Sequence, residues 1–221
     1  MSTQGAGERT KTGIHFVVTG TPRSGTRYVA RVLQKLGFDC HHERHFTPWD
    51  VITEDCRLND IPWGDSSWLA APFLHMLPAT TKVFHVVREP LHTLNSIIGT
   101  GQIDWPDDYR TFIAKHCWND ENYWPKNVGL DAQTFWVRWN LMIERSGRVN
   151  RRFRVEEIPA ALLGIAADIG GSGISARDIA GVLDAVPRNV NTREHDSSLR
   201  LTRSDLTDEC VEMARRYGYD Y

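Results

Sequence analysis

The amino-acid sequence predicts an α/β fold in which a central parallel sheet lies between two layers of helices. Two apolar runs with strand character, at residues 14–19 and 82–87, are each followed by a turn and then by apolar residues at helical spacing. Strands that alternate with helices form parallel sheets with right-handed crossovers. The chain has 221 residues, 41% of them hydrophobic, so we expect one domain over 14–221 after a disordered tail at 1–13.

Capping residues locate the predicted helices. Gly37 ends the first one, because glycine is common just past a helix C-terminus. Ser67 is a favourable N-cap, and Pro90 is favoured at a first helical position. Ser175 and Asp178 have the spacing of a capping box. The helices are expected at residues 26–36, 68–77, 91–98, 133–146, 175–186 and 205–217.

Two further strands are expected at residues 38–40 and 152–158, where β-branched or aromatic residues gather. The segment 101–128 is rich in Trp, Pro and Asp and has no regular pattern, so we expect a lid or an insertion that faces the substrate. Ligands bind at the carboxyl ends of the strands in parallel sheets of this type. Polar clusters follow three of the predicted strands, at residues 20–28, 41–45 and 88–90.

The loop after the first strand is the most informative part of the sequence. Gly20, Pro22 and Gly25 form a tight turn that leads into a helix, an arrangement whose backbone N–H groups and helix N-terminus bind phosphate. A nucleotide-binding P-loop has lysine directly after the second glycine, where this chain has Thr26. The cation of this loop is instead Arg23, which lies two residues before Gly25.

This loop resembles the 5′-phosphosulfate loop of sulfotransferases that use 3′-phosphoadenosine 5′-phosphosulfate (PAPS). Arg88 and Ser96 resemble the pair that holds the 3′-phosphate of the cofactor in that family. The alternative to this phosphate-binding role is that Arg88 forms a surface ion pair and that Ser96 lies on a solvated helix face. The resemblance covers most of residues 14–219, favours the bacterial, carbohydrate-sulfotransferase-like branch, and implies a P-loop-like three-layer fold. It implies cofactor contacts from Pro22, Arg23, Ser24, Gly25, Thr26, Arg27, Tyr28, Arg88 and Ser96.

Two of these positions differ from the cytosolic animal members, because Arg27 and Tyr28 replace a threonine and a tryptophan. Tyr28 can still offer an aromatic face to adenine, whereas one hydroxyl–phosphate contact is lost at Arg27. A late loop with Asn189, Asn191 and Arg193 lies where the family often covers the 3′-phosphate.

The polar cluster after the second strand contains the candidate general bases. The carbohydrate-modifying branch uses a glutamate here, so the resemblance implies Glu43 as the base and Arg23 as the group that stabilises charge on the leaving nucleotide. His42 and His41 are alternatives, and so is a solvated loop with no catalytic role. An extended backbone would place His41 and Glu43 on one face and His42 on the other.

The resulting hypothesis is a sulfotransferase that transfers a sulfuryl group from PAPS to a hydroxyl or amine of a small-molecule or carbohydrate acceptor. A P-loop nucleotide kinase and a non-catalytic nucleotide-binding protein are the alternatives. The net charge of −2 provides no general attraction for nucleic acid, and the histidines have no metal-ligand spacing. We therefore expect a cytoplasmic protein without a metal or a membrane span, and we leave a homodimer open.

The cysteines are scattered and are expected to be free thiols. A basic run could contact an anionic acceptor, although a solvated surface is the simpler interpretation. The run consists of Arg145, Arg148, Arg151, Arg152 and Arg154.

Overall fold

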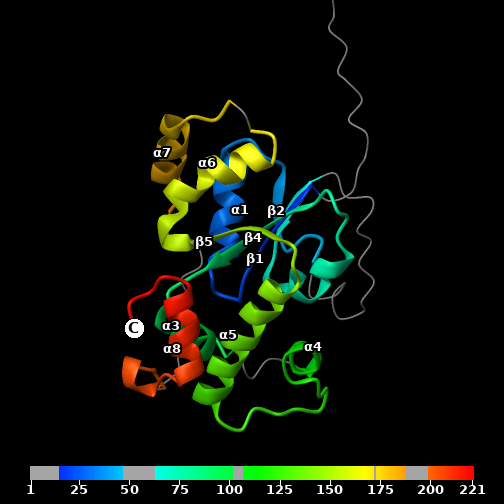
Figure 1. Ribbon diagram of the computed structural model, residues 1–221, viewed down its shortest axis with the longest axis vertical. Coiled ribbons are helices and arrows are strands. Elements are labelled where there is room, and N and C mark those ends of the chain that lie inside the picture. Colours follow the sequence, from blue (N-terminus) through cyan, green and yellow to red (C-terminus); the bar gives the residue numbers. More distant parts are fainter. Residues whose placement is uncertain (1–14, 47–62, 102–106, 172, 188–198) are drawn as a thin grey trace, which may run out of the picture.

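A five-stranded parallel sheet with helices on both faces forms the centre of the molecule (Figure 1). The computed structural model describes residues 15–46, 63–101, 107–171, 173–187 and 199–221. The order of the strands is β2-β3-β1-β4-β5, so β1 lies in the middle, between β3 and β4. The predicted α/β class and its central parallel sheet are confirmed. The strands are β1 (Phe16–Thr19), β2 (Cys40–His42), β3 (Gly64–Ser66), β4 (Lys82–Val87) and β5 (Val149–Arg154).

Side chains alternate across the buried strands and supply both hydrophobic layers. Phe16 and Val18 point to one face, which is covered by α1 (Thr26–Lys35), α6 (Ile158–Asp168) and α7 (Ala176–Ala185). Val17 points to the opposite face. That face is covered by the 3₁₀ helix η1 (Trp68–Met76) and by α3 (Pro90–Gly99), α5 (Val128–Arg145) and α8 (Asp208–Arg216).

The helix α4 (Asp107–Trp118) packs on the outside of this second layer. The ring of Phe112 lies 6.2 Å from the ring of Phe73 in η1 and 6.2 Å from that of Trp139 in α5. Part of the segment 101–128 therefore forms a regular helix. Two short 3₁₀ helices, η2 (Val155–Glu157) and η3 (Arg203–Asp205), complete the described elements.

Several elements differ from the sequence-based expectation. The strand β3 was not predicted, because its sequence Gly-Asp-Ser has no apolar side chain; Gly64 fits there because the ring of Phe16 occupies the space of a Cβ. The helix predicted at residues 68–77 is present as η1; it is a 3₁₀ helix, and Pro72 lies inside it. The helix α6 was also not predicted. Helix α5 begins five residues earlier than expected, at a cap formed by Asn127.

Some predictions lie outside the described residues, namely the tail 1–13 and the late loop with Asn189, Asn191 and Arg193. None of the helices in the described part of the chain has the length and apolar character needed to cross a membrane. Three cysteines are buried free thiols, as expected; they are Cys40, Cys117 and Cys210.

Candidate functional site

The loop between β1 and α1 is tight and depends on its glycines. A Cβ on Gly20 would collide with the carbonyl oxygen of Val86 and with the hydroxyl of Ser24. Gly25 has a φ of 103°, which favours glycine, and a Cβ there would lie 2.8 Å from Val155. Arg23 also adopts a left-handed φ, of 68°. Backbone strain of this kind is often found where a loop is shaped around a ligand.

The N-terminus of α1 has the features of an anion site. Gly25 is its N-cap, no side chain caps the helix, and its first turn has no acidic residue. The first N–H groups and the positive end of the helix dipole therefore face this loop. The hydroxyl of Ser24 is buried and has no hydrogen-bond partner among the described residues. A buried hydroxyl without a partner is destabilising, so an oxygen-rich ligand would satisfy it.

The predicted 3′-phosphate residues meet this loop directly. The Nε of Arg23 donates a hydrogen bond of 2.8 Å to the Oγ of Ser96, and an Nη of Arg88 donates to the carbonyl oxygen of Arg23 at 3.2 Å. Ser96 is only 7% exposed, so it does not lie on a solvated helix face. The strand order explains the meeting, because β1 and β4 are neighbours and their carboxyl ends lie side by side.

A cavity of about 240 Å³ lies beside Gly25 and Arg88. Tyr28 also lines this cavity. The sequence analysis missed the other lining residues, which are His92, Val155, Glu156 and Ile158. The predicted strand 152–158 placed Glu156 inside the sheet. The structure ends β5 at Arg154, so that Val155 and Glu156 follow a carboxyl end, where ligands bind.

Glu156 connects this cavity to the C-terminus. One carboxylate oxygen accepts the backbone N–H of Glu89 at 3.0 Å, and the other accepts the hydroxyl of Tyr219 at 3.0 Å. Glu89 in turn caps α3, because its carboxylate accepts the backbone N–H of His92 at 2.7 Å. These bonds fix the backbone directly after Arg88.

His42 and Glu43 also reach the loop. The Nε2 of His42 lies 3.4 Å from the Oγ1 of Thr26 and 3.8 Å from a carboxylate oxygen of Glu43. The extended backbone that would place His41 and Glu43 on one face ends at His42, because Glu43 has a left-handed φ of 52°. The Nε2 of His41 contacts a carboxylate oxygen of Asp39 at 3.1 Å.

The two neighbours differ in their protonation. Burial, together with the charge of Asp65, raises the pKa of Glu43 to about 7, while Arg27 opposes this shift. Burial, together with Arg27 and Arg31, lowers the pKa of His42 to about 4. At neutral pH His42 is therefore uncharged, and Glu43 is close to its midpoint, where a carboxylate exchanges protons most readily.

Asp65 holds the turn that presents Glu43. It lies on β3, is completely buried, and accepts the backbone N–H groups of His45 at 2.9 Å and Phe46 at 3.1 Å. Burial, together with the charge of Glu43, raises the pKa of Tyr109 to about 12. Tyr109 belongs to α4, so the charge of Glu43 acts on a residue of this helix.

No model of a protein family and no curated protein matches the chain. Among solved structures, the sulfotransferase domain of the olefin synthase from Synechococcus PCC 7002 matches with a TM-score of 0.50 at 13% identity, covering 99% of each chain. A sulfotransferase from Alicyclobacillus acidocaldarius matches with a TM-score of 0.47 at 14% identity, covering 94% of this chain and 96% of that one. The resemblance inferred from the loop is thus confirmed for the fold, and the chain has the fold of a sulfotransferase domain.

Proposed function

We propose that this protein is a PAPS-dependent sulfotransferase. The observation that carries the proposal is the hydrogen bond between Arg23 and Ser96, together with the contact of Arg88 with the same loop. Two cationic groups from different parts of the chain are thereby held at one phosphate-binding loop. A nucleotide with phosphates at both its 3′ and 5′ positions needs two such groups close together.

The described residues suit each part of this cofactor. The N–H groups at the start of α1 and the buried hydroxyl of Ser24, which has no partner within the described ranges, would hold the 5′-phosphosulfate. Arg88 and Ser96 would hold the 3′-phosphate, and the cavity beside Tyr28 would take the adenosine. When bound, PAPS supplies an activated sulfuryl group whose leaving group is a stable nucleotide.

Glu43 is the proposed general base. Its carboxylate would take the proton of the acceptor hydroxyl or amine as the sulfuryl group passes from the bound cofactor to that acceptor atom and the nucleotide is left as the leaving group. Arg23 and the N–H groups of the loop stabilise the negative charge that stays on the nucleotide. His42, uncharged at neutral pH, keeps Thr26 in place through its contact at 3.4 Å.

The acceptor is a hydroxyl or amine of a small molecule or a carbohydrate. A nucleotide kinase is less well supported, since its loop has lysine where this chain has Thr26. It also needs a carboxylate to hold magnesium, whereas β4 leads into Arg88.

The first prediction concerns the ligand. We expect the product nucleotide, 3′,5′-adenosine bisphosphate, to bind in the micromolar range, about −8 kcal/mol, in the presence of a metal chelator. The same nucleotide should raise the melting temperature, because it binds the folded state alone. Calorimetric titration checks the affinity. Tighter binding of ATP with magnesium would instead support the kinase.

Binding alone does not separate an enzyme from a nucleotide-binding protein. Labelled PAPS with a panel of sugars, phenols and amines makes that distinction. Transfer of label to any member of the panel supports the enzyme, and the transfer should stop when Arg23 is replaced by alanine. Tight binding of the bisphosphate with no transfer to the whole panel would favour the non-catalytic alternative.

A further inference from the structure

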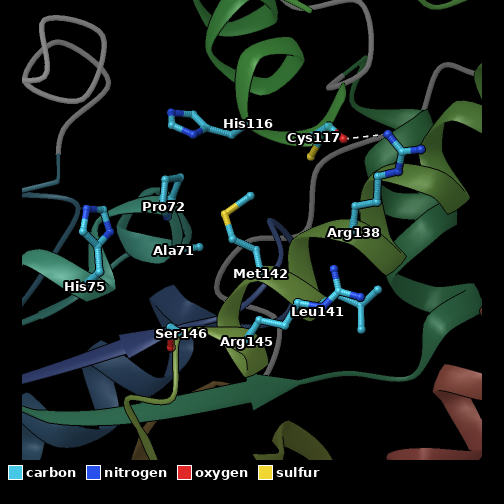
Figure 2. Close-up of a pocket in the computed structure, with 10 residues that line it drawn as sticks. All are labelled: Ala71, Pro72, His75, His116, Cys117, Arg138, Leu141, Met142, Arg145 and Ser146. Atoms are coloured by element: carbon cyan, nitrogen blue, oxygen red, sulfur yellow. Dashed lines mark hydrogen bonds between the residues drawn. The ribbon is translucent and has the colours of Figure 1, made fainter. Parts of the chain in front are cut away.

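A second and larger cavity, of about 510 Å³, opens between η1, α4 and α5. Figure 2 shows side chains from these three elements around it. Its volume lies in the range of sites that hold small organic molecules. It shares no lining residue with the phosphate loop, with His42 and Glu43, or with the cavity beside Tyr28.

The helix α5 forms the floor of this cavity with a regular pattern. Leu141 and Met142 lie between Arg138 and Arg145, which are seven residues apart. Residues at this spacing lie on one face of a helix, about 10 Å apart along its axis. The floor is therefore apolar in its middle and cationic at both ends. His75 of η1 and His116 of α4 stand in the facing walls (Figure 2).

Arg145 differs from the other arginines of the basic run. The guanidinium of Arg148 donates to the carbonyl oxygens of Leu77 and Pro78, at 2.8 Å and 2.7 Å. The remaining three have carboxylate partners: Arg151 contacts Asp168, Arg152 contacts Glu144, and Arg154 contacts Glu157. Within the described part of the chain, Arg145 has neither a hydrogen bond nor an ion pair, and no carboxylate lines the cavity.

Arg138 is fixed in a different way. One Nη donates to the carbonyl oxygen of Cys117 at 2.7 Å (Figure 2), which ties α5 to the end of α4 and holds the cavity in shape. The other end of the cavity reaches Ser146, close to the start of β5. That end lies at the amino edge of the parallel sheet, whereas the phosphate loop lies at the carboxyl edge.

We propose that this cavity is a second binding site, for an organic anion with an apolar body. The apolar part of the ligand would lie on Leu141 and Met142, because these side chains offer a partly buried, adaptable surface. Its acidic group, a carboxylate, sulfate or sulfonate, would pair with Arg145. This proposal does not depend on the sulfotransferase reaction.

The probe for this site is 8-anilinonaphthalene-1-sulfonate, a fluorescent anion with an apolar body. It is titrated against the full-length protein in saturating 3′,5′-adenosine bisphosphate, so that the nucleotide site is blocked. We expect one probe to bind for each chain. Arg145→Gln should weaken it about tenfold, the size of one charge-assisted hydrogen bond. His75→Glu should weaken it at least as much, because it places a carboxylate opposite Arg145.

The matched control is Arg177→Gln, which removes an exposed arginine from α7 on the opposite face of the sheet. It should leave the affinity for the probe unchanged. Arg145, His75 and Arg177 are all exposed, so the variants should fold, and their melting temperatures verify this. Equal affinities of Arg145→Gln and the wild type would overturn the proposal. So would the absence of probe binding, or full displacement of the probe by the bisphosphate alone.

Discussion

The chemistry of Glu43 is set by the residues around it. Burial, and to a smaller extent the charge of Asp65, raises its pKa, Arg27 opposes them, and the result is a pKa of about 7. The neighbouring His42 is held uncharged, because burial lowers its pKa to about 4. Of the two, only Glu43 has a pKa close to neutral pH, which is what an efficient general base requires.

Replacing Glu43 by glutamine should therefore lower kcat by about 10²–10⁴-fold, the usual contribution of a general base. The amide keeps the shape of the side chain, so the affinity for 3′,5′-adenosine bisphosphate should stay the same. His42→Ala is the matched comparison and should cost much less. Steady-state turnover with an acceptor found in the panel provides the measurement. A larger loss in His42→Ala than in Glu43→Gln would transfer the role of base to the histidine.

The pH dependence of the reaction gives a second test at the same residue. The base must be deprotonated, so kcat/KM should rise with pH and level off above about 7, the pKa of Glu43. Asp65→Asn removes a like charge, so the rise of kcat/KM should occur at lower pH. Arg27→Gln removes an opposite charge and should move it to higher pH. Shifts of this pH in opposite directions would identify Glu43 as the group that titrates. If neither variant changed the pH at which kcat/KM rises, another group would be responsible.

At the scale of elements, the site lies at the carboxyl ends of two neighbouring strands, β1 and β4, where the connections to the following helices begin. The loop after β1 and the turn after β4 meet through Arg23, Arg88 and Ser96 because these strands pair directly. Glu156 of η2, directly after β5, and Tyr219 near the C-terminus add support, since their bonds hold the backbone at Glu89.

This arrangement predicts a selective loss of affinity. Arg88→Ala should weaken binding of 3′,5′-adenosine bisphosphate by about 2–3 kcal/mol, as expected for a charged hydrogen bond to phosphate. Binding of 5′-AMP, which has no 3′-phosphate, should hardly change. Calorimetry with both nucleotides measures the difference. Equal losses for the two would assign Arg88 a structural role, through its contact with the carbonyl oxygen of Arg23.

The sequence predicts best those elements that carry strong local signals. The strands β1 and β4 are rich in apolar and β-branched residues, and α7 begins at the capping box of Ser175 and Asp178, so all three were located. The strand β3 forms because tertiary contacts with β1 and β2 hold it, which no local pattern of Gly64–Ser66 reveals.

The candidate site shows the same division. The loop residues and Arg88 follow predicted strands, so topology alone brings them to one edge of the sheet. The position of Glu43 relative to His41 and His42 depends on the left-handed φ of Glu43, a conformation that glutamate rarely adopts and that the sequence does not signal. The role of Asp65 could not be predicted without the position of β3. The cavity beside α5 could not be predicted without the packing of η1, α4 and α5 against one another.

At the scale of the whole molecule, the sheet separates two hydrophobic layers, and one of them contains a buried titratable group. His85 on β4 is completely buried, and its Nε2 lies 2.9 Å from the Oδ1 of Asn140 in α5. Burial is the main reason that its pKa is lowered to about 4, while the bond to Asn140 opposes the shift. Protonation of His85 thus couples the packing of α5 on the sheet to pH.

The last prediction follows from this coupling. The pKa of His85 is lower in the folded protein than the ordinary 6.5, so the folded state binds fewer protons than the unfolded state. Its contribution to stability is fully present above pH 6.5 and is lost as the pH falls towards 4, at a cost on the order of 3 kcal/mol. His42 acts in the same direction, whereas Glu43 acts in the opposite one, because its raised pKa favours the folded state at low pH.

Denaturant unfolding between pH 4 and 7 should therefore show a smaller loss of stability on acidification in His85→Gln than in the wild type. The exposed His75→Gln is the control and should follow the wild type, and identical pH slopes in all three proteins would show that His85 is not buried in its uncharged form.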